Sequence, residues 1–415
     1  MSRLWRLLVL GLLALGACTP APLAVLAPGG RLAFVGGEGD LFTVQADGSD
    51  VRRLTRLGGP EDAEHRQAHF WPTWSPDGRR IAVTRADLVD GELAGAGLYA
   101  VPAGGGPALK LYAAEHTVPF FCAWAPDSRT IAILTTEEGS VALHVRAADG
   151  SGGHQLAAGN PLYLAWAPDG RALAVHLNGD VSSNPEAGVF IVPVEGGSGR
   201  TMPLAPTGFR APAYTPDGHT LVTAGSGPDG RDVVVAFGDD GAPRPLAALD
   251  GAPAFVLSPT GDRLALSRHA PVQGLLDALD VVDLASGATA RWDPGPVVAF
   301  FWSPDGTRLA WIRADLSERE LVWYVAERPG AARRVAAFVP SNPSAATLSF
   351  FDQYAPTTAF WSPDSRRLAF AGWLGRVPDG PSRIWVADLA TDAPPRAVAD
   401  GLMASWSPAL ARPSS

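Results

Sequence analysis

A short motif, an aromatic residue followed by Ser-Pro-Asp-Gly, recurs along the whole chain. The copy at Trp302–Gly306 reads WSPDG and is followed by the alternating apolar run TRLAWI. Successive copies lie 42 to 59 residues apart, a period typical of solenoids, propellers and similar arrays. The copies begin at Trp74, Trp124, Trp166, Tyr214, Leu257, Trp302 and Trp361, with a truncated copy at Trp406 and a degenerate one at Leu26.

Each copy is followed by three short apolar runs separated by turns. After the first complete copy these are Ile81–Arg85, LYAVPAGG and LKLYA, and none has the length or the period of a stable helix. Together with the strand that ends in the aromatic residue, each unit therefore predicts four antiparallel strands. Four-stranded antiparallel units in a circular array are the blades of a β-propeller, so the predicted fold class is all-β, with one propeller domain.

The motif has a structural explanation at every position. Proline fixes φ for the first central position of a tight turn, aspartate bonds backbone amides two residues on, and glycine takes a positive φ. We therefore expect the motif to join the first and second strands of a blade. The aromatic residue is expected to be a wedge between neighbouring blades, because a buried tryptophan brings both apolar area and an N–H donor.

Eight blades are predicted, because second strands begin near residues 31, 80, 130, 172, 220, 263, 308 and 367. The N-terminal unit lacks a strong first strand, whereas the C-terminal segment Ala404–Pro408 has a first strand and nothing after it. We expect the two to complete one blade and close the ring, which removes exposed sheet edges. Seven blades is the alternative if the N-terminal unit or the Leu257 unit is not a blade.

The repeated x-W-S-P-D-G-x-x-I-A pattern resembles the propeller repeat of the TolB family and of related WD-like repeat proteins. The resemblance covers about residues 26–410 and implies the propeller fold. This chain departs from that family in two ways. TolB-like proteins carry an α/β domain before the propeller, whereas here only a short tether follows Cys18. TolB itself is soluble and six-bladed, whereas this chain is predicted to be lipidated and longer. A role in the Tol-Pal system is therefore not implied. Prolyl oligopeptidases join a similar propeller to a hydrolase domain, for which this chain has no room.

The first residues predict export and lipid attachment. Arg3 and Arg6 precede the apolar run LLVLGLLALGA, which is too short to span a bilayer comfortably. The run ends in Leu-Gly-Ala-Cys at Cys18 and resembles the bacterial lipobox, which implies a diacylglyceryl group on Cys18; a plain secretory signal is the alternative. The predicted divisions are a signal peptide at 1–17, a tether at 18–27, the propeller at 28–410 and a tail at 411–415. The chain is expected in the cell envelope, on the periplasmic or extracellular side of a membrane.

The charge of the chain excludes some partners. Its net charge is −9, and loss of Arg3 and Arg6 makes it more negative. Nucleic acid binding needs clustered lysine and arginine, so no nucleic acid partner is expected, and the predicted membrane link is the lipid itself. Besides Cys18 the only cysteine is Cys122, in the apolar run PFFCAW, where we expect a buried, non-catalytic thiol. A monomer is expected.

A long insertion before the last blade, at residues 339–356, is the main candidate binding element. It carries three aromatic residues, an acid and an amide in succession, a composition that resembles an interaction hot spot. The alternative is a loop that plugs the channel with its own aromatic side chains. The residues are Phe350, Phe351, Asp352, Gln353 and Tyr354.

A second insertion, at residues 56–69, precedes blade two and should lie near the first at the channel mouth. His65, Arg66, His69 and the adjacent Phe70 are its candidate binding residues. The spacing His-x-x-x-His suits a metal only on a helix, which this stretch does not favour. We therefore expect a solvated loop and predict no metal and no cofactor.

No nucleophile elbow, P-loop or dinucleotide-binding motif occurs in the sequence. The favoured interpretation is a non-enzymatic lipoprotein that binds a partner protein, peptide or envelope polymer through one loop face and the channel mouth. The alternative is a propeller enzyme, a lyase, lactonase or hydrolase, with its site in the channel. Such an enzyme would need several His, Asp or Glu side chains to converge there from different blades.

Overall fold

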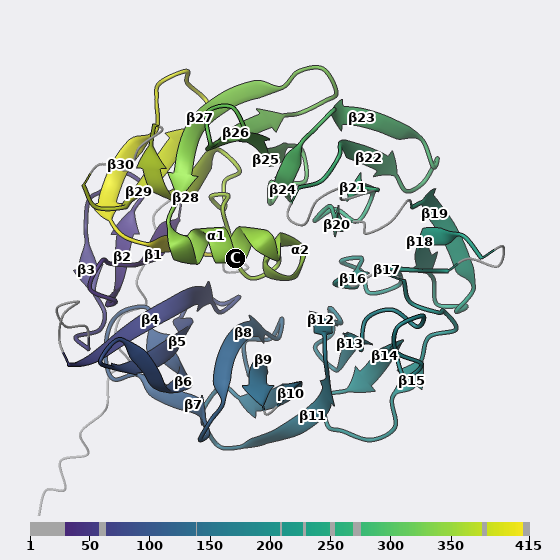
Figure 1. The fold of residues 1–415 in the computed structure, drawn as a ribbon, viewed down its shortest axis with the longest axis horizontal. Coiled ribbons are helices and arrows are strands. Elements are labelled where there is room, and N and C mark those ends of the chain that lie inside the picture. The colour runs from purple at the N-terminus through teal and green to yellow at the C-terminus, as the bar shows by residue number, and fades with distance from the viewer. Residues whose placement is uncertain are drawn as a thin grey trace, which may run out of the picture.

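The strands of the chain are arranged in a ring in the computed structural model (Figure 1). The structure describes residues 30–57, 64–137, 139–207, 210–226, 230–249, 254–268, 275–375 and 380–409. The predicted signal peptide, Cys18, the tether and the tail lie outside the described residues. Within the described part, the strands group into eight blades, and the all-β propeller prediction is confirmed.

The first four blades follow the predicted pattern of antiparallel strands. Blade 1 contains β1 (Arg31–Val35), β2 (Leu41–Gln45), β3 (Arg52–Arg53) and β31 (Met403–Trp406). Blade 2 contains β4 (His65–Trp74), β5 (Arg80–Val89), β6 (Glu92–Pro102) and β7 (Leu109–Ala113). Blade 3 contains β8 (Val118–Trp124), β9 (Thr130–Glu137), β10 (Ser140–Ala147) and β11 (Gly153–Gly159). Blade 4 contains β12 (Leu162–Trp166), β13 (Ala172–Leu177), β14 (Gly188–Pro193) and β15 (Arg200–Thr201).

The remaining blades complete the circle. Blade 5 contains β16 (Ala213–Tyr214), β17 (Leu221–Ser226), β18 (Asp232–Phe237) and β19 (Pro243–Ala248). Blade 6 contains β20 (Ala254–Leu257), β21 (Arg263–Ser267), β22 (Leu279–Asp283) and β23 (Thr289–Asp293). Blade 7 contains β24 (Val297–Trp302), β25 (Leu309–Asp315), β26 (Glu320–Ala326) and β27 (Arg333–Pro340). Blade 8 contains β28 (Arg367–Leu374), β29 (Arg383–Asp388) and β30 (Arg396–Asp400).

Blade 8 has an unusual inner edge. Residues 359–361 take the place of its innermost strand, with a single bridge between Trp361 and Leu368. Its β28 also pairs with the end of β27, through Phe338–Pro340, and this joins blades 7 and 8 into one seven-stranded sheet. The two blades are therefore linked by backbone hydrogen bonds as well as by side-chain packing.

The ring closes as the sequence predicts. β31, near the C-terminus, pairs antiparallel with β1, near the N-terminus, from Leu32↔Trp406 to Val35↔Met403. The backbone N–H groups of Arg31 and Ser407 add bonds at the end of this pairing, to Ser407 Oγ at 3.0 Å and to Arg31 O at 2.7 Å. Blade 1 is therefore assembled from both ends of the propeller, which locks the circle.

The Ser-Pro-Asp-Gly turns also have the predicted chemistry. In the Ser75–Gly78 turn, Gly78 has φ of 66° and donates its N–H to Ser75 O at 2.8 Å. Asp77 Oδ1 accepts the backbone N–H of Arg79, two residues on, at 3.0 Å. Where serine replaces the glycine, at Ser128 and Ser365, it adopts the same left-handed backbone, with φ of 61° and 57°.

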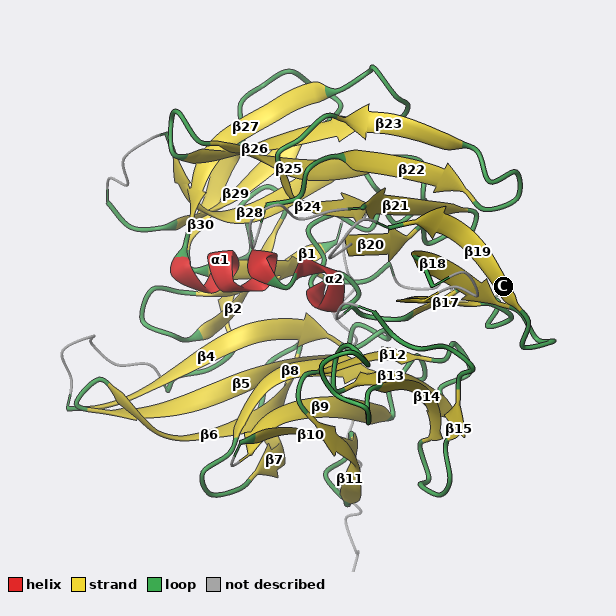
Figure 2. Cartoon of the chain, turned by 45° about the vertical axis from the view of Figure 1, so that its right-hand side comes forward, coloured by secondary structure: helices red, strands yellow, loops and turns green. Residues whose placement is uncertain are grey.

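Two short helices lie between the blades across the middle of the ring (Figure 2). They are α1 (Asn342–Ser349) and α2 (Phe351–Tyr354), and both belong to the insertion before the last blade. Ser341 caps α1 by accepting the N–H of Ser344, and Pro343 sits in its first turn.

Candidate functional site

The insertion that carries α1 and α2 connects β27 of blade 7 to blade 8 and crosses the channel, and we call residues 341–358 the plug. Its first residues are bound near the closing strand, because Ser341 Oγ and Ser344 Oγ both donate to Leu402 O. Farther along, the plug contacts blades 7, 3 and 4. Figure 1 shows it lying over the centre of the ring.

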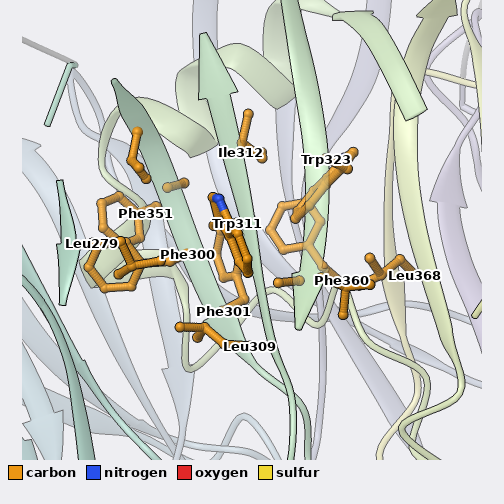
Figure 3. Close-up of a cluster of buried hydrophobic side chains, with 14 of the residues drawn as sticks. Leu279, Phe300, Phe301, Leu309, Trp311, Ile312, Trp323, Phe351, Phe360 and Leu368 are labelled. Carbon is orange, nitrogen blue, oxygen red and sulfur yellow. The ribbon is translucent and has the colours of Figure 1, made fainter. Parts of the chain in front are cut away.

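Phe351 anchors the plug to blade 7. Its side chain is buried, and its ring packs edge-to-face against Phe300, with centroids 4.8 Å apart, and against Phe301 at 5.9 Å. Figure 3 shows Phe351 beside Leu279 and Phe300 in the cluster of buried apolar side chains. The cluster continues through Trp323 and Phe360, so α2 is part of the core of this sector.

Tyr354 and Gln353, in the same helix as Phe351, anchor the plug to blades 3 and 4. Tyr354 packs edge-to-face on Phe121 and donates its hydroxyl to Phe120 O at 2.7 Å, and burial raises the pKa of its phenol. The Gln353 amide imitates a neighbouring strand: Oε1 accepts Leu164 N at 3.2 Å and Nε2 lies 3.5 Å from Leu164 O. These bonds tie a segment near the C-terminus to the inner strands of blades 3 and 4.

Asp352 and Phe350 complete the predicted set, and they lie in opposite surroundings. Asp352 is buried, and burial raises the pKa of its carboxyl although the nearby Arg210 charge opposes that shift. Phe350, in contrast, is 52% exposed at the junction of the two helices. Of the five predicted residues, the structure therefore packs Phe351, Asp352, Gln353 and Tyr354 against the propeller and leaves Phe350 open to solvent. The four buried residues therefore act as a plug. Of the five, only Phe350 is accessible to a partner while the plug stays in place.

The second predicted set lies on a strand, although we expected a solvated loop. β4 begins at His65, and His69 is 1% exposed, with Nδ1 2.9 Å from Gly39 O. Burial lowers the pKa of His69. His65 is exposed, and Arg66 and Phe70 are half-buried. Four residues along a strand span about 13 Å, so the two histidines cannot share a metal ion. The loop prediction failed because it ignored the antiparallel pairing of this stretch with β5.

The two predicted insertions do approach each other. Trp71, directly after the His65–Phe70 stretch, lines a small cavity together with Ser344 and Thr347 of α1. Trp71 has φ of 52°, at a bulge between Phe70 and Thr73, and its N–H lies 3.0 Å from Met403 Sδ. Sequence reasoning did not single out Trp71, because nothing in its local sequence marks a bulge.

A cavity of about 620 Å³ lies beneath the plug and runs along the channel. Its floor includes Asp352, Gln353 and Phe360, and its walls come from inner strands all around the ring. The aromatic or leucine residue that opens each Ser-Pro-Asp-Gly copy contributes to these walls: Trp74, Trp124, Trp166, Tyr214, Leu257, Trp302, Trp361 and Trp406.

The cavity opens on the face of the Ser-Pro-Asp-Gly turns. Prolines of four of these turns, Pro76, Pro216, Pro259 and Pro304, line it and are exposed. The plug lies at the other end, among the longer loops. The accessible mouth of the cavity is therefore on the face with the shorter turns, whereas the sequence predicted binding at the face with the longer loops.

The cavity lining is poor in ionisable groups. Among its described lining residues, only Asp352 and Tyr214 titrate, and burial raises the pKa of Tyr214 to about 12. Within the described ranges no three His, Cys, Asp or Glu side chains are grouped so that they could hold a metal ion. Cys122 is buried, as expected, and burial raises the pKa of its thiol to about 12. None of the described helices is long and apolar enough to cross a membrane.

Five of the tryptophans in the walls also hold neighbouring blades together, and we call them the seam tryptophans. Each donates Nε1–H to the carbonyl of the residue that precedes the motif in the previous blade. The bonds are Trp74 to Ser405 O at 3.1 Å, Trp124 to Thr73 O at 3.0 Å, Trp166 to Ala123 O at 2.9 Å, Trp302 to Val256 O at 3.1 Å and Trp361 to Phe301 O at 3.1 Å. The predicted wedge role is therefore visible as one repeated hydrogen bond.

Three positions depart from this pattern. Trp406 is fully buried, but its Nε1 has no partner among the described residues; its backbone N–H instead donates to Ala359 O at 2.9 Å. Blades 5 and 6 carry Tyr214 and Leu257, which have no indole N–H, and both side chains are half-buried. The cavity wall is consequently least covered at blades 4 to 6, where Trp166, Tyr214 and Leu257 remain partly accessible.

Comparison with known proteins identifies the fold. No protein-family model and no curated protein matches the chain. An oligogalacturonate lyase in complex with manganese is similar over 87% of this chain and 98% of its own, with 16% identity and a TM-score of 0.52. A prolyl endopeptidase matches 82% of this chain and 50% of its own, with 13% identity and a TM-score of 0.52. TolB from Acinetobacter baumannii matches 83% of each chain, with 12% identity and a TM-score of 0.40. At these identities the similarity establishes the fold alone.

Proposed function

We propose that this chain is an exported, lipid-anchored propeller that binds a partner protein, peptide or envelope polymer without transforming it. The observation that carries the proposal is the channel cavity of about 620 Å³ with its aromatic and proline walls. Its size falls within the range of about 300–1,000 Å³ typical of ligand pockets, which are mostly apolar with a few placed polar groups.

The composition of the walls favours binding over catalysis. General acid–base catalysis commonly uses positioned groups whose pKa values lie near the working pH. The ionisable groups in the described lining are Asp352 and Tyr214. The phenol of Tyr214 titrates too high for that task, so Asp352 has no second acid or base of suitable pKa beside it in the described lining. The partly accessible side chains of Trp166, Tyr214 and Leu257, by contrast, suit an apolar segment of a partner.

The plug limits how a partner can enter. The helices and Gln353 close the loop-face end of the channel, so a ligand enters between the turn prolines and ends against the plug. A linear chain would insert one end and could not thread through. The signal segment and Cys18 support placement at a membrane surface, where such a mouth could meet an envelope component.

A crosslinking pull-down from intact membranes tests this proposal. Leu257→Trp fills part of the cavity with the residue that most other blades carry, and Phe350→Ala changes the exposed loop-face aromatic instead. We expect Leu257→Trp to lose a partner that the wild type and Phe350→Ala both capture. Equal capture by wild type and Leu257→Trp, with loss in Phe350→Ala, would move the interface to the loop face. A ligand recovered in chemically altered form would support the enzyme alternative.

A further inference from the structure

Asp352 Oδ2 is the one buried side-chain oxygen of the described cavity lining that has no hydrogen-bond partner. Asp352 is 8% exposed, lines the cavity, and its Oδ2 has no hydrogen-bond partner among the described residues. Leaving a buried polar group unsatisfied costs about 1–3 kcal/mol and more for a charged one, so natural structures rarely keep one without a reason.

The plug holds this carboxyl where it is. The neighbouring residues Phe351, Gln353 and Tyr354 are all buried, and Gln353 and Tyr354 are bonded to the backbones of blades 4 and 3. Asp352 cannot turn toward bulk solvent while these contacts persist. Backbone N–H groups of Gln353 and Ala211 bond the carboxyl, and Oδ2 is left without a partner among the described residues. An acceptor atom that is held in place and left unpaired in this way is a preorganised binding group.

The surrounding wall suits a positive charge. Lysine, arginine and histidine are absent from the described lining, and tryptophan, tyrosine and phenylalanine side chains make up much of it. Aromatic faces attract cations by about 0.5–2 kcal/mol, with more gained when the cation is desolvated. Arg210 acts on Asp352 through its charge, but it is not one of the lining residues.

We infer that the ligand of the channel carries a primary ammonium group on an apolar or aromatic body, with the ammonium against Asp352 and the body along Trp166, Tyr214 and Leu257. This inference rests on the proposed function, because it specifies what the cavity binds. A free amine, a peptide N-terminus or a lysine side chain would supply the same chemistry.

A pair of probes matched in size separates the charge from the apolar body. 2-Phenylethylamine carries the ammonium, and propylbenzene replaces it with a methyl group. Binding to the full folded chain can be followed by tryptophan fluorescence, since tryptophans line the cavity. Asp352→Asn keeps the shape of the side chain and removes its charge, and Phe350→Ala alters the same segment away from the cavity. Asparagine is nearly isosteric with aspartate, so Asp352→Asn should be tolerated in the fold, which a thermal melt would verify.

We expect the wild type and Phe350→Ala to bind 2-phenylethylamine, and Asp352→Asn to bind it at least tenfold more weakly, as for a truncated buried charge pair. Propylbenzene should bind all three proteins alike. Phenylalanine amide and its N-acetyl derivative, run in parallel, show whether a peptide N-terminus is accepted.

Two results would overturn the inference, and only the second would also contradict the proposed binding function. If 2-phenylethylamine binds Asp352→Asn as well as the wild type, the ammonium assignment is wrong while binding in the cavity stands. If neither probe binds the wild type, both the ammonium assignment and the proposed binding function of the cavity fail.

Discussion

Blades 2, 3, 4, 7 and 8 are joined to their preceding blades by an indole-to-carbonyl hydrogen bond, whereas blades 5 and 6 lack it. In four blades of the first group the seam tryptophan is buried, as Trp302 is at 7% exposure, and in blade 4 Trp166 is half-buried. In the second group Tyr214 and Leu257 leave the seam half-covered and facing the cavity. The contrast shows that the repeated tryptophan stabilises the contacts between blades. Its hydrogen bond is missing at blades 5 and 6, on the side where the cavity wall is most accessible to a ligand. Protein sites commonly give up stability for function in this way.

The largest effect should come from removing the wedge itself. Trp302→Ala is expected to lower the free energy of unfolding by about 3–5 kcal/mol, because it deletes a buried indole and leaves a cavity. Leu257→Ala, at the equivalent position of blade 6, should cost about 2 kcal/mol or less, since that side chain is only half-buried. Denaturant unfolding of both variants measures the difference, and equal losses would remove the distinction between the two kinds of seam.

The hydrogen bond can be separated from the packing. Trp302→Phe retains an aromatic ring but leaves Val256 O without its donor, and we expect a loss of about 1–3 kcal/mol. Tyr214→Phe, where no indole bond exists, should change stability by less than about 0.5 kcal/mol. Thermal and chemical unfolding of the pair would show this; a comparable loss in Tyr214→Phe would mean that the indole bond is not what differs.

The missing bond can also be installed. Leu257→Trp places an indole where the repeat predicts that Ala213 O would accept its N–H, so stability should rise by about 1 kcal/mol. The cavity should shrink at the same time, and fluorescence or small-molecule binding would report that. A variant that is destabilised would indicate that the half-covered seam has no room for the consensus residue.

The smallest effect concerns an arginine that stacks across a seam. The guanidinium of Arg263 lies 4.7 Å from the centroid of the Trp302 ring and donates to Gly306 O. Arg263→Ala should cost about 1 kcal/mol, in line with a partly exposed cation–π contact and one hydrogen bond. Arg79→Ala, at an exposed turn position, is the matched control and should be neutral. Melting temperatures that fall equally in both variants would argue against a stacking contribution.

The fold could be predicted from the sequence because every repeat encodes its own turn. Pro, Asp and Gly fix the geometry of the turn, and Gly78 and Ser128 adopt the expected positive φ. Ring closure was predictable too, since the half-blade at Ala404–Pro408 needed a partner and β1 had a free edge. These features are local or follow from edge pairing, so a single sequence reveals them.

The candidate site was predictable only in part. An aromatic cluster such as Phe350–Tyr354 has the same composition whether it binds a partner or packs against its own blades. Only the contacts with Phe120 and Leu164, which are distant in the sequence, show that it packs against the blades. α1 carries no apolar stripe, with only Thr347 and Leu348 buried, so periodicity could not reveal it, although Ser341 and Pro343 are typical of a helix start. The cavity is built from residues of all eight repeats, and no linear pattern indicates which of them remain accessible.

Site-specific photocrosslinking tests the central claim, that a ligand enters the channel between the turns and lies along blades 4 to 6. A photoreactive phenylalanine would replace Tyr214 in the cavity wall in one variant and Phe350 on the loop face in another, and both would be irradiated in intact membranes. The account predicts an adduct from position 214 and none from position 350. An adduct from position 350 alone would contradict it and would return the plug to the role of the binding surface.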